Sequence, residues 1–333
     1  MHATSRPRIV RRAVHGVLLL DKPLGLSSND ALQIAKRLYR AEKAGHTGTL
    51  DPLATGLLPL CFGAATKFSQ VSLDADKAYR GTLRLGQRTS TGDLEGSVVE
   101  ERPVHLQRQA IDEVLARFNG AVEQTPPMHS ALKKDGKALY EYARAGVEVE
   151  RPTRRVQIHR IDVVAWQDEM LELDVVCSKG TYIRTLAEDI GAALGCGAHL
   201  TALRRTGSGA LSLAHAVTLA ELDALDEPQR DARLLGADAL LADRPAVVLD
   251  ADEAGRFLSG LRRRIVHADC AAVRVYGPAT RPAAHEQAAP GALLGSAHVT
   301  AGELIADRLL SPLEVQAMHP EMSSLAAAAP AHA

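Results

Sequence analysis

The chain has 333 residues, of which 46% are hydrophobic and 24% are charged, and its formal net charge at pH 7 is −1. This composition is typical of a soluble globular protein, and the length allows one large domain together with a smaller one. A small scaffold that depends on disulfides for its stability is therefore excluded.

The near-neutral total hides a basic N-terminal region, because the first fifty residues contain nine Lys or Arg and three Asp or Glu. We expect residues 1–14 to form a basic arm. A polyanionic partner explains this charge, and so does a solvated arm followed by a helix with a charged face. The apolar run at residues 17–20 ends at Asp21 and is too short for a signal peptide or a membrane span, which predicts a cytoplasmic protein.

Hydrophobic spacing predicts a strand at residues 16–20 and, after a turn, a helix that Ser27 or Ser28 can cap. The polar side of this helix is basic. Residues 45–59 are rich in Gly, Thr and Pro, which predicts a loop. After this loop, strands are predicted at residues 77–101, 156–164 and 171–177. Helices are predicted at residues 106–118, 138–145 and 181–194.

Strands and helices follow one another without a regular βαβ alternation, and no G-x-G-x-x-G motif is present. This order predicts an α+β fold with a mixed, largely antiparallel sheet flanked by helices, and it argues against a doubly wound parallel sheet. We expect a large domain at residues 15–243, with a helical connection from about residue 214, and a small β-rich module at residues 244–318. The Ala-rich residues 319–333 are expected to be disordered. The strands expected in the module are at residues 247–249, 273–276 and 293–299.

The four cysteines, Cys61, Cys177, Cys196 and Cys270, form no CxxC pair, as expected for reduced thiols. Cys196 and His199 form a C-x-x-H pattern. A zinc site needs two more ligands, and Cys177 is the one near candidate, so we expect no metal.

The segment GHTGTLDPLATGLLP at residues 45–59 carries the residues best suited to chemistry. Asp51 precedes a proline, so its backbone is biased away from helix and toward an extended conformation. The glycines allow tight bends or close approach of a ligand, and His46 adds a flat ring with two nitrogens. A simple turn, in which the carboxylate caps its own backbone, is also compatible with these residues. A phosphate-binding loop is disfavoured, because no lysine follows the glycines and the carboxylate would repel a phosphate.

This segment and the preceding GVLLLDKPLGLSS at residues 16–28 closely resemble the signature of the TruB family, the bacterial tRNA pseudouridine-55 synthases. Further matching segments follow in the family's order: KAYRG at 77–81, QTPPMHSALK at 124–133, LYEYAR at 139–144, CSKGTYIRTL at 177–186, GCGAHL at 195–200 and LRR at 203–205. The resemblance covers approximately residues 15–210. His129 departs from it, because the family often has Tyr there, so a hydroxyl role at this position is open. The C-terminal third matches less closely and resembles a PUA-like RNA-binding module.

The resemblance implies that the chain isomerises uridine 55 in the T-loop of tRNA by detaching uracil from C1′ of the ribose, turning it and rejoining it through C5. Such an isomerisation needs no cofactor and no metal. Asp51 is implied as the nucleophile, at either the sugar carbon or the ring, and Arg184 as the cation that keeps it ionised. Tyr79 is implied as the platform on which the uracil stacks, and its phenol as an aid to proton removal from C5.

The resemblance also implies residues that bind RNA. His46 would enter the RNA loop where the flipped base had been, Tyr182 and Leu203 would line the uracil pocket, and Lys22 would support the catalytic loop. Basic residues of the N-terminal third, and the arginines at 262–264, would contact phosphates. The expected partner is therefore tRNA, bound through its T-loop and stem by a monomeric protein that does not contact membranes.

Two other functions are open. A non-catalytic RNA-binding or RNA-folding protein would use the same surface, but it needs no carboxylate beside phosphates. A hydrolase that uses Asp51 as its nucleophile would need metal ligands or a second acid, and no motif supplies them. Mapping of pseudouridine in tRNA distinguishes these functions from the isomerase.

Overall fold

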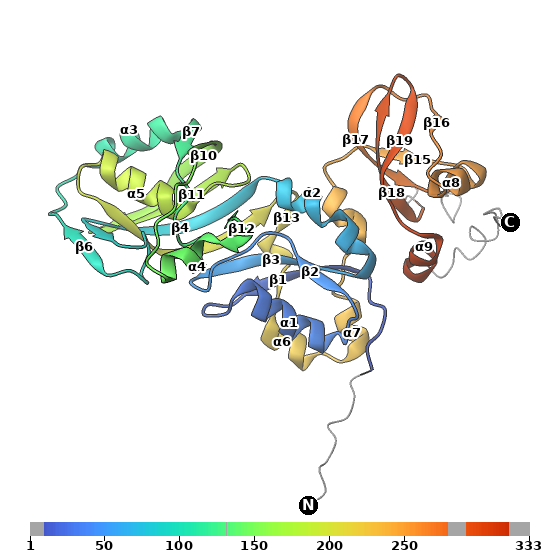
Figure 1. Cartoon of the computed structure of the whole chain (residues 1–333), viewed down its shortest axis with the longest axis horizontal. Coiled ribbons are helices and arrows are strands. Elements are labelled where there is room, and N and C mark those ends of the chain that lie inside the picture. Colours follow the sequence, from blue (N-terminus) through green and yellow to red (C-terminus); the bar gives the residue numbers. More distant parts are fainter. Residues whose placement is uncertain (1–9, 131, 279–290, 320–333) are drawn as a thin grey trace, which may run out of the picture.

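The computed structural model describes residues 10–130, 132–278 and 291–319. One large sheet runs through most of the molecule, and a separate, smaller sheet forms the C-terminal part (Figure 1). Most of the predicted arm and tail lie outside the described residues. Arg12, near the end of the arm, is bound by the carbonyl of Tyr39 at 3.0 Å and by Asp231 at 2.7 Å, so the chain is already packed at this point.

The large sheet is mixed and mostly antiparallel. Its strands are β1 (Gly16–Lys22), β2 (Ala44–His46), β3 (Ala54–Phe62), β4 (Lys77–Leu85), β7 (Gly120–Gln124), β10 (Arg154–Gln167), β11 (Met170–Cys177), β12 (Ala198–Ser208), β13 (Leu211–Ser212) and β14 (Val217–Thr218). Their order is β14-β1-β3-β12-β4-β11-β10-β7, with β2 beside β3 and β13 beside β12. The pairs β1 with β14 and β3 with β12 are parallel, and the others are antiparallel. The predicted fold class is confirmed.

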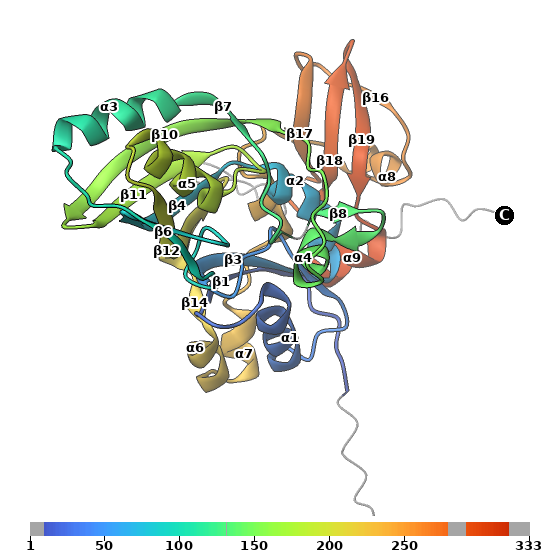
Figure 2. The same ribbon diagram turned by 60° about the vertical axis from the view of Figure 1, so that its left-hand side comes forward.

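Two groups of helices cover the large sheet. The first consists of α3 (Arg108–Phe118) and α5 (Ile183–Ala193), whose apolar residues pack against β4, β10 and β11. The second consists of α1 (Ser28–Leu38), α6 (Leu219–Ala224) and α7 (Glu227–Asp231), which lie together beside β1 and β3 (Figures 1 and 2). Ser27 caps α1 by accepting the N–H of Asp30 at 3.1 Å, as predicted. None of the helices in the described ranges is long and apolar enough to cross a membrane.

Strand β1 shows how the sheet joins two hydrophobic cores. Leu18 and Leu20 pack toward α1, whereas Val17 and Leu19 belong to the core shared with the C-terminal part. Successive side chains of a strand point to opposite faces, so a strand covered on both sides is apolar throughout. This explains the unbroken apolar run at residues 17–20.

The smaller sheet has the order β15-β17-β18-β19-β16. Its elements are β15 (Ala246–Val248), α8 (Ala251–Leu258), β16 (Arg263–Arg264), β17 (Cys270–Tyr276), β18 (Leu293–Thr300), β19 (Glu303–Leu309) and α9 (Pro312–Met318). The three strands expected here are confirmed, and β16 and β19 are additional to them.

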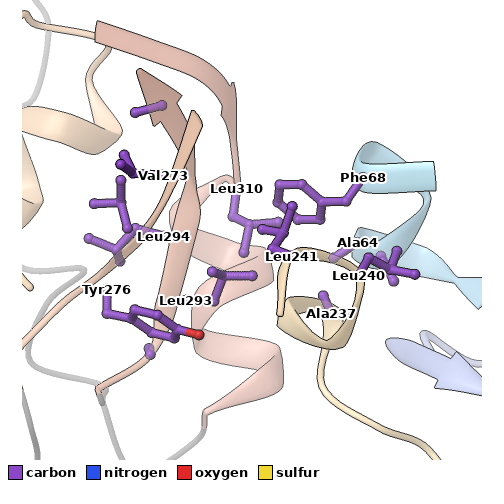
Figure 3. Close-up of a cluster of buried hydrophobic side chains, with 14 of the residues drawn as sticks. Ala64, Phe68, Ala237, Leu240, Leu241, Val273, Tyr276, Leu293, Leu294 and Leu310 are labelled. Atoms are coloured by element: carbon purple, nitrogen blue, oxygen red, sulfur yellow. The ribbon is translucent and has the colours of Figure 1, made fainter. Parts of the chain in front are cut away.

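The C-terminal sheet packs against the rest of the molecule through a continuous apolar cluster (Figure 3). Phe68, from the short helix η1 (Gly63–Phe68), and Leu241, from η3 (Ala237–Leu241), lie beside Leu310 and Leu293. Burial of this apolar surface fixes the two sheets relative to each other.

The remaining elements are short. They are α2 (Ser69–Asp74), β5 (Gln87–Thr89), β6 (Val98–Glu101), β8 (Lys133–Lys134), β9 (Lys137–Ala138), α4 (Leu139–Arg144) and η2 (Leu213–His215). Two predictions need correction. Residues 45–59 are not one loop, because β2 and most of β3 lie within them, and the connection from residue 214 is not wholly helical, because β14 joins the large sheet beside β1. Central β3 is buried from residue 57 to 62 and therefore lacks the alternation that marks a strand.

Candidate active site

The loop that joins β2 to β3 is fixed by hydrogen bonds to the segment after β1. The hydroxyl of Ser28 accepts the N–H of Leu50 at 2.7 Å and donates to the carbonyl of the same residue at 2.9 Å. Gly25 donates its N–H to the carbonyl of Pro52 at 2.8 Å. Asp51 therefore lies between two anchored residues.

Asp51 forms an ion pair with Arg184, which lies in the first turn of α5. Their Oδ2 and Nη2 atoms are 2.9 Å apart. The Arg184 side chain is buried, whereas 45% of the Asp51 side chain is exposed. The contact expected between these two residues is present, and its carboxylate side is accessible to a substrate.

Arg184 is also held by a second carboxylate. Its Nη1 donates to Oδ2 of Asp93 at 3.0 Å, and the Asp93 side chain is 1% exposed. The other Asp93 oxygen accepts the hydroxyl of Thr91 at 2.6 Å and the N–H of Glu95 at 3.0 Å. Asp93 therefore orients the guanidinium through Nη1, while Nη2 binds Asp51. This contact has no signal in the local sequence, because no spacing links Asp93 to an arginine 91 residues later.

His129 contributes its backbone to this network. Its carbonyl accepts a hydrogen bond from Nη2 of Arg184 at 2.5 Å, so one nitrogen serves both this carbonyl and Asp51. A tyrosine in place of His129 would supply the same carbonyl. This bond therefore does not depend on whether residue 129 is His or the Tyr that the family often has.

A cavity of about 160 Å³ opens beside the ion pair. Pockets for drug-sized ligands are about 300–1,000 Å³, so this one suits a single base better than a larger ligand. Five residues singled out from the sequence line it: Asp51, Tyr79, Tyr182, Arg184 and Leu203. The other lining residues are Thr49, Leu50, Ala54, Ser130, Thr181 and Ile183.

Tyr79 on β4 lies directly opposite Arg205 on β12. Arg205 is 1% exposed and donates to the carbonyls of Leu57 at 2.7 Å and Gly48 at 3.1 Å. Burial raises the pKa of Tyr79, and the Arg205 guanidinium acts in the opposite direction. Arg205 thus connects the loop between β2 and β3 to the strand that carries Tyr79, a link that depends on strand pairing and has no signal in the local sequence.

His46 and Lys22 do not line the cavity. His46 ends β2, its Nδ1 is buried without a hydrogen-bond partner, and burial lowers its pKa, which favours the neutral ring at pH 7. Lys22 is fully buried, and its Nζ donates to the carbonyls of Pro23 at 2.9 Å and Leu26 at 2.6 Å. These bonds indicate that Lys22 supports the turn after β1. They do not suit direct contact of Lys22 with RNA, which was also expected.

Within the described ranges, no group of three or more His, Cys, Asp or Glu side chains is arranged to hold a metal ion. The C-x-x-H pair has backbone partners instead. The Cys196 thiol donates to the carbonyl of Gly197, and Nδ1 of His199 lies 3.0 Å from the carbonyl oxygen of Gln87.

Two family models together match residues 36–242. A model described as TruB family pseudouridylate synthase (N terminal domain) matches residues 36–183. A model described as tRNA pseudouridylate synthase B C-terminal domain matches residues 184–242.

Curated relatives match over nearly the whole chain. A protein of Cupriavidus pinatubonensis named tRNA pseudouridine synthase B is 59% identical over 307 residues, which cover 91% of this chain and 96% of the relative. A protein of Burkholderia mallei with the same name is 57% identical over 312 residues, which cover 92% and 97%.

Solved structures share the fold. A Cbf5-Nop10-Gar1 complex contains a chain with a TM-score of 0.67 and 24% identity, which covers 90% of this chain and 87% of that one. An H/ACA RNP bound to a substrate RNA containing 2′-deoxyuridine contains a chain with a TM-score of 0.65 and 21% identity, with coverage of 90% and 86%.

Proposed function

Because the chain belongs to the TruB family of pseudouridylate synthases, we propose that it is an isomerase that converts uridine 55 in the T-loop of tRNA to pseudouridine. The observation that carries the proposal is the ion pair of Asp51 and Arg184 at the edge of a cavity of about 160 Å³. An exposed carboxylate with a fixed cation behind it suits covalent catalysis on a nucleotide.

The reaction exchanges bonds within one nucleotide. The C1′–N1 bond breaks and a C1′–C5 bond forms, while C5 loses a proton and N1 gains one. Asp51 acts as the nucleophile, either at C1′ or at C6 of the ring. Both routes require the carboxylate to approach a flipped nucleotide. The half-exposed Asp51 can do so, whereas the buried Asp93 cannot.

Arg184 holds the nucleophile in place throughout this cycle. Its planar guanidinium donates in fixed directions to Asp51 and Asp93. Substrate binding therefore does not need to reorganise the arginine. Such preorganisation of charge lowers the cost of reaching the transition state.

Tyr79 and Leu203 supply walls between which the base is held, and Tyr182 completes the lining. Stacking on an aromatic side chain contributes about 1–3 kcal/mol per base, and extrusion of a base from its stack costs a few kcal/mol. One aromatic platform therefore offsets much of the cost of flipping the uridine. The Tyr79 phenol is also the group we assign to assist removal of the C5 proton.

His46 is the residue we assign to the gap that the flipped base leaves in the RNA. A neutral imidazole loses less hydration than a charged one when it inserts among bases, and burial already lowers the pKa of His46. Basic side chains of the N-terminal region and the arginines at 262–264 contact phosphates in this proposal, the latter from a PUA-like module. The protein acts as a cytoplasmic monomer, without a metal or a cofactor.

The proposal is tested by incubating the protein with an unmodified tRNA transcript and mapping pseudouridine along the RNA. We expect modification at position 55, and no requirement for an added metal or nucleotide. Binding of tRNA without any modification would instead indicate an RNA-binding or RNA-folding protein. Modification at another position would correct the assigned target and leave the chemistry intact.

A further inference from the structure

Ser130 is one of the residues that line the catalytic cavity. The residue is 4% exposed, and its Oγ has no hydrogen-bond partner. Buried polar groups are normally paired, so an unpaired hydroxyl beside a cavity indicates a partner that binds there. Another hydroxyl of the lining, that of Thr181, already donates to the carbonyl of Ser178 at 2.9 Å.

The backbone around Ser130 is anchored to the ion pair. The preceding carbonyl, that of His129, binds the same Arg184 nitrogen that binds Asp51. On its other side, the carbonyl of Ser130 accepts the N–H of Tyr140, in α4, at 3.1 Å. The backbone of Ser130 is therefore held at a set position relative to the nucleophile.

We propose that the Ser130 hydroxyl donates a hydrogen bond to a carbonyl oxygen of the flipped uracil. This inference rests on the proposed function, because it names a further group in the same site. Uracil presents two carbonyl oxygens at its edges, and the hydroxyl needs one acceptor to be satisfied.

The chemistry gives this bond a catalytic role. When the C1′–N1 bond breaks, its electron pair passes to N1 and is shared with O2 and O4 of the ring, until the C1′–C5 bond forms. When Asp51 instead adds to C6, the electron pair of the C5–C6 double bond is shared with O4. On both routes negative charge grows on a base oxygen, and a donor directed at it stabilises the charged state more than the ground state.

The test compares Ser130→Ala with Ser208→Ala in single-turnover reactions on a tRNA transcript. Ser208 is a matched control, because it is 2% exposed, its Oγ also lacks a partner, and it lines a separate cavity of about 20 Å³, which is too small for a base. We expect Ser130→Ala to slow pseudouridine formation at least about tenfold, with tRNA affinity and thermal midpoint unchanged. Ser208→Ala should react at the wild-type rate. Ser130→Cys, which keeps a weak donor, should lie between wild type and Ser130→Ala.

A second readout separates a bond to the base from a structural role. Transcripts with 2-thiouridine or 4-thiouridine at the target replace one base oxygen with sulfur, which is a weaker acceptor. We expect one of the two to slow the wild-type enzyme relative to uridine, and to slow Ser130→Ala much less. An equal thio effect in both proteins would overturn the inference, and so would an unchanged rate in Ser130→Ala. If the wild-type protein made no pseudouridine, the proposed function itself would fail.

Discussion

Asp51 and Asp93 bind opposite ends of one guanidinium: Arg184 reaches Asp51 through Nη2 at 2.9 Å and Asp93 through Nη1 at 3.0 Å. The two carboxylate side chains differ in exposure, at 45% and 1%. The exposed one can meet a substrate, whereas the buried one can orient the arginine. Burial thus assigns different roles to two acids that share a partner.

Asp51→Asn should abolish detectable pseudouridine formation and leave tRNA affinity largely unchanged. The amide keeps the shape of the side chain but is a poor nucleophile, and the RNA-binding surface is untouched. Single-turnover assays and filter binding measure the two effects separately. Substantial turnover by this variant would contradict the assignment of Asp51 as nucleophile.

Asp93→Asn should impair both catalysis and stability, because it removes the buried charge that faces Arg184. Loss of one partner from a buried ion pair costs on the order of 3 kcal/mol, and we expect the reaction rate to fall along with the thermal midpoint. The comparison is Asp174→Asn, which breaks a pair with Arg80 at the surface, with distances of 2.9 and 2.8 Å. Exposed pairs contribute about 0–1 kcal/mol, so an equal loss in both variants would argue against an orienting role for Asp93.

Arg154→Ala should weaken tRNA binding and reduce its dependence on salt. The Arg154 guanidinium lies 4.7 Å from the ring centroid of Tyr182, at the edge of the cavity, and donates to the carbonyl of Gly180. If it contacts one phosphate, its loss should lower the slope of log affinity against log salt by about 0.7–0.9. Arg160→Ala, on the same strand, is the control, because Arg160 is paired with Asp162 at 3.2 Å. The same slope in wild type and Arg154→Ala would exclude that phosphate contact.

The lowered pKa values of two buried lysines predict that the free energy of unfolding rises with pH in the mildly alkaline range. Desolvation lowers the pKa of Lys22 and of Lys77 from 10.5 to about 8. Above pH 8 the unfolded chain therefore binds more protons at these positions than the folded chain, and the free energy of unfolding increases with pH. Burial raises the pKa of Cys61 to about 12 and of Cys177 to about 11, from 9.0, which gives the opposite slope at higher pH.

We therefore expect a maximum of stability near pH 9, measured by denaturant unfolding at a series of pH values. Lys77→Met removes one titrating group, so the increase from pH 8 to pH 9 should be smaller in this variant, whatever its absolute stability. Lys77 donates to three backbone carbonyls, including that of Ser72 at 2.8 Å, so some general destabilisation is also expected. An undiminished increase in the variant would show that Lys77 does not titrate in this range.

Local patterns were sufficient to predict elements whose stability depends on nearby residues. Helix α1 follows from its serine cap and its apolar spacing, and α5 from similar spacing. The central strands were harder to predict. Strand β3 has hydrophobic cores on both faces, so it shows no simple alternation and its sequence is compatible with a loop. Strand β12 is rich in polar and partly exposed residues, so its sequence lacks the apolar run or alternation of a strand.

Among the site residues, Asp51, Arg184 and Tyr79 could be named in advance because each lies within a sequence segment characteristic of the family. The roles of Asp93, Arg205 and Ser130 became visible when the chain was folded. Asp93 meets Arg184 across 91 positions, Arg205 faces Tyr79 through strand pairing, and Ser130 has no partner until a ligand is considered. Composition and short-range order therefore identify the chemical groups, whereas burial and long-range pairing decide their roles, because exposure and hydrogen bonding are properties of the packed molecule.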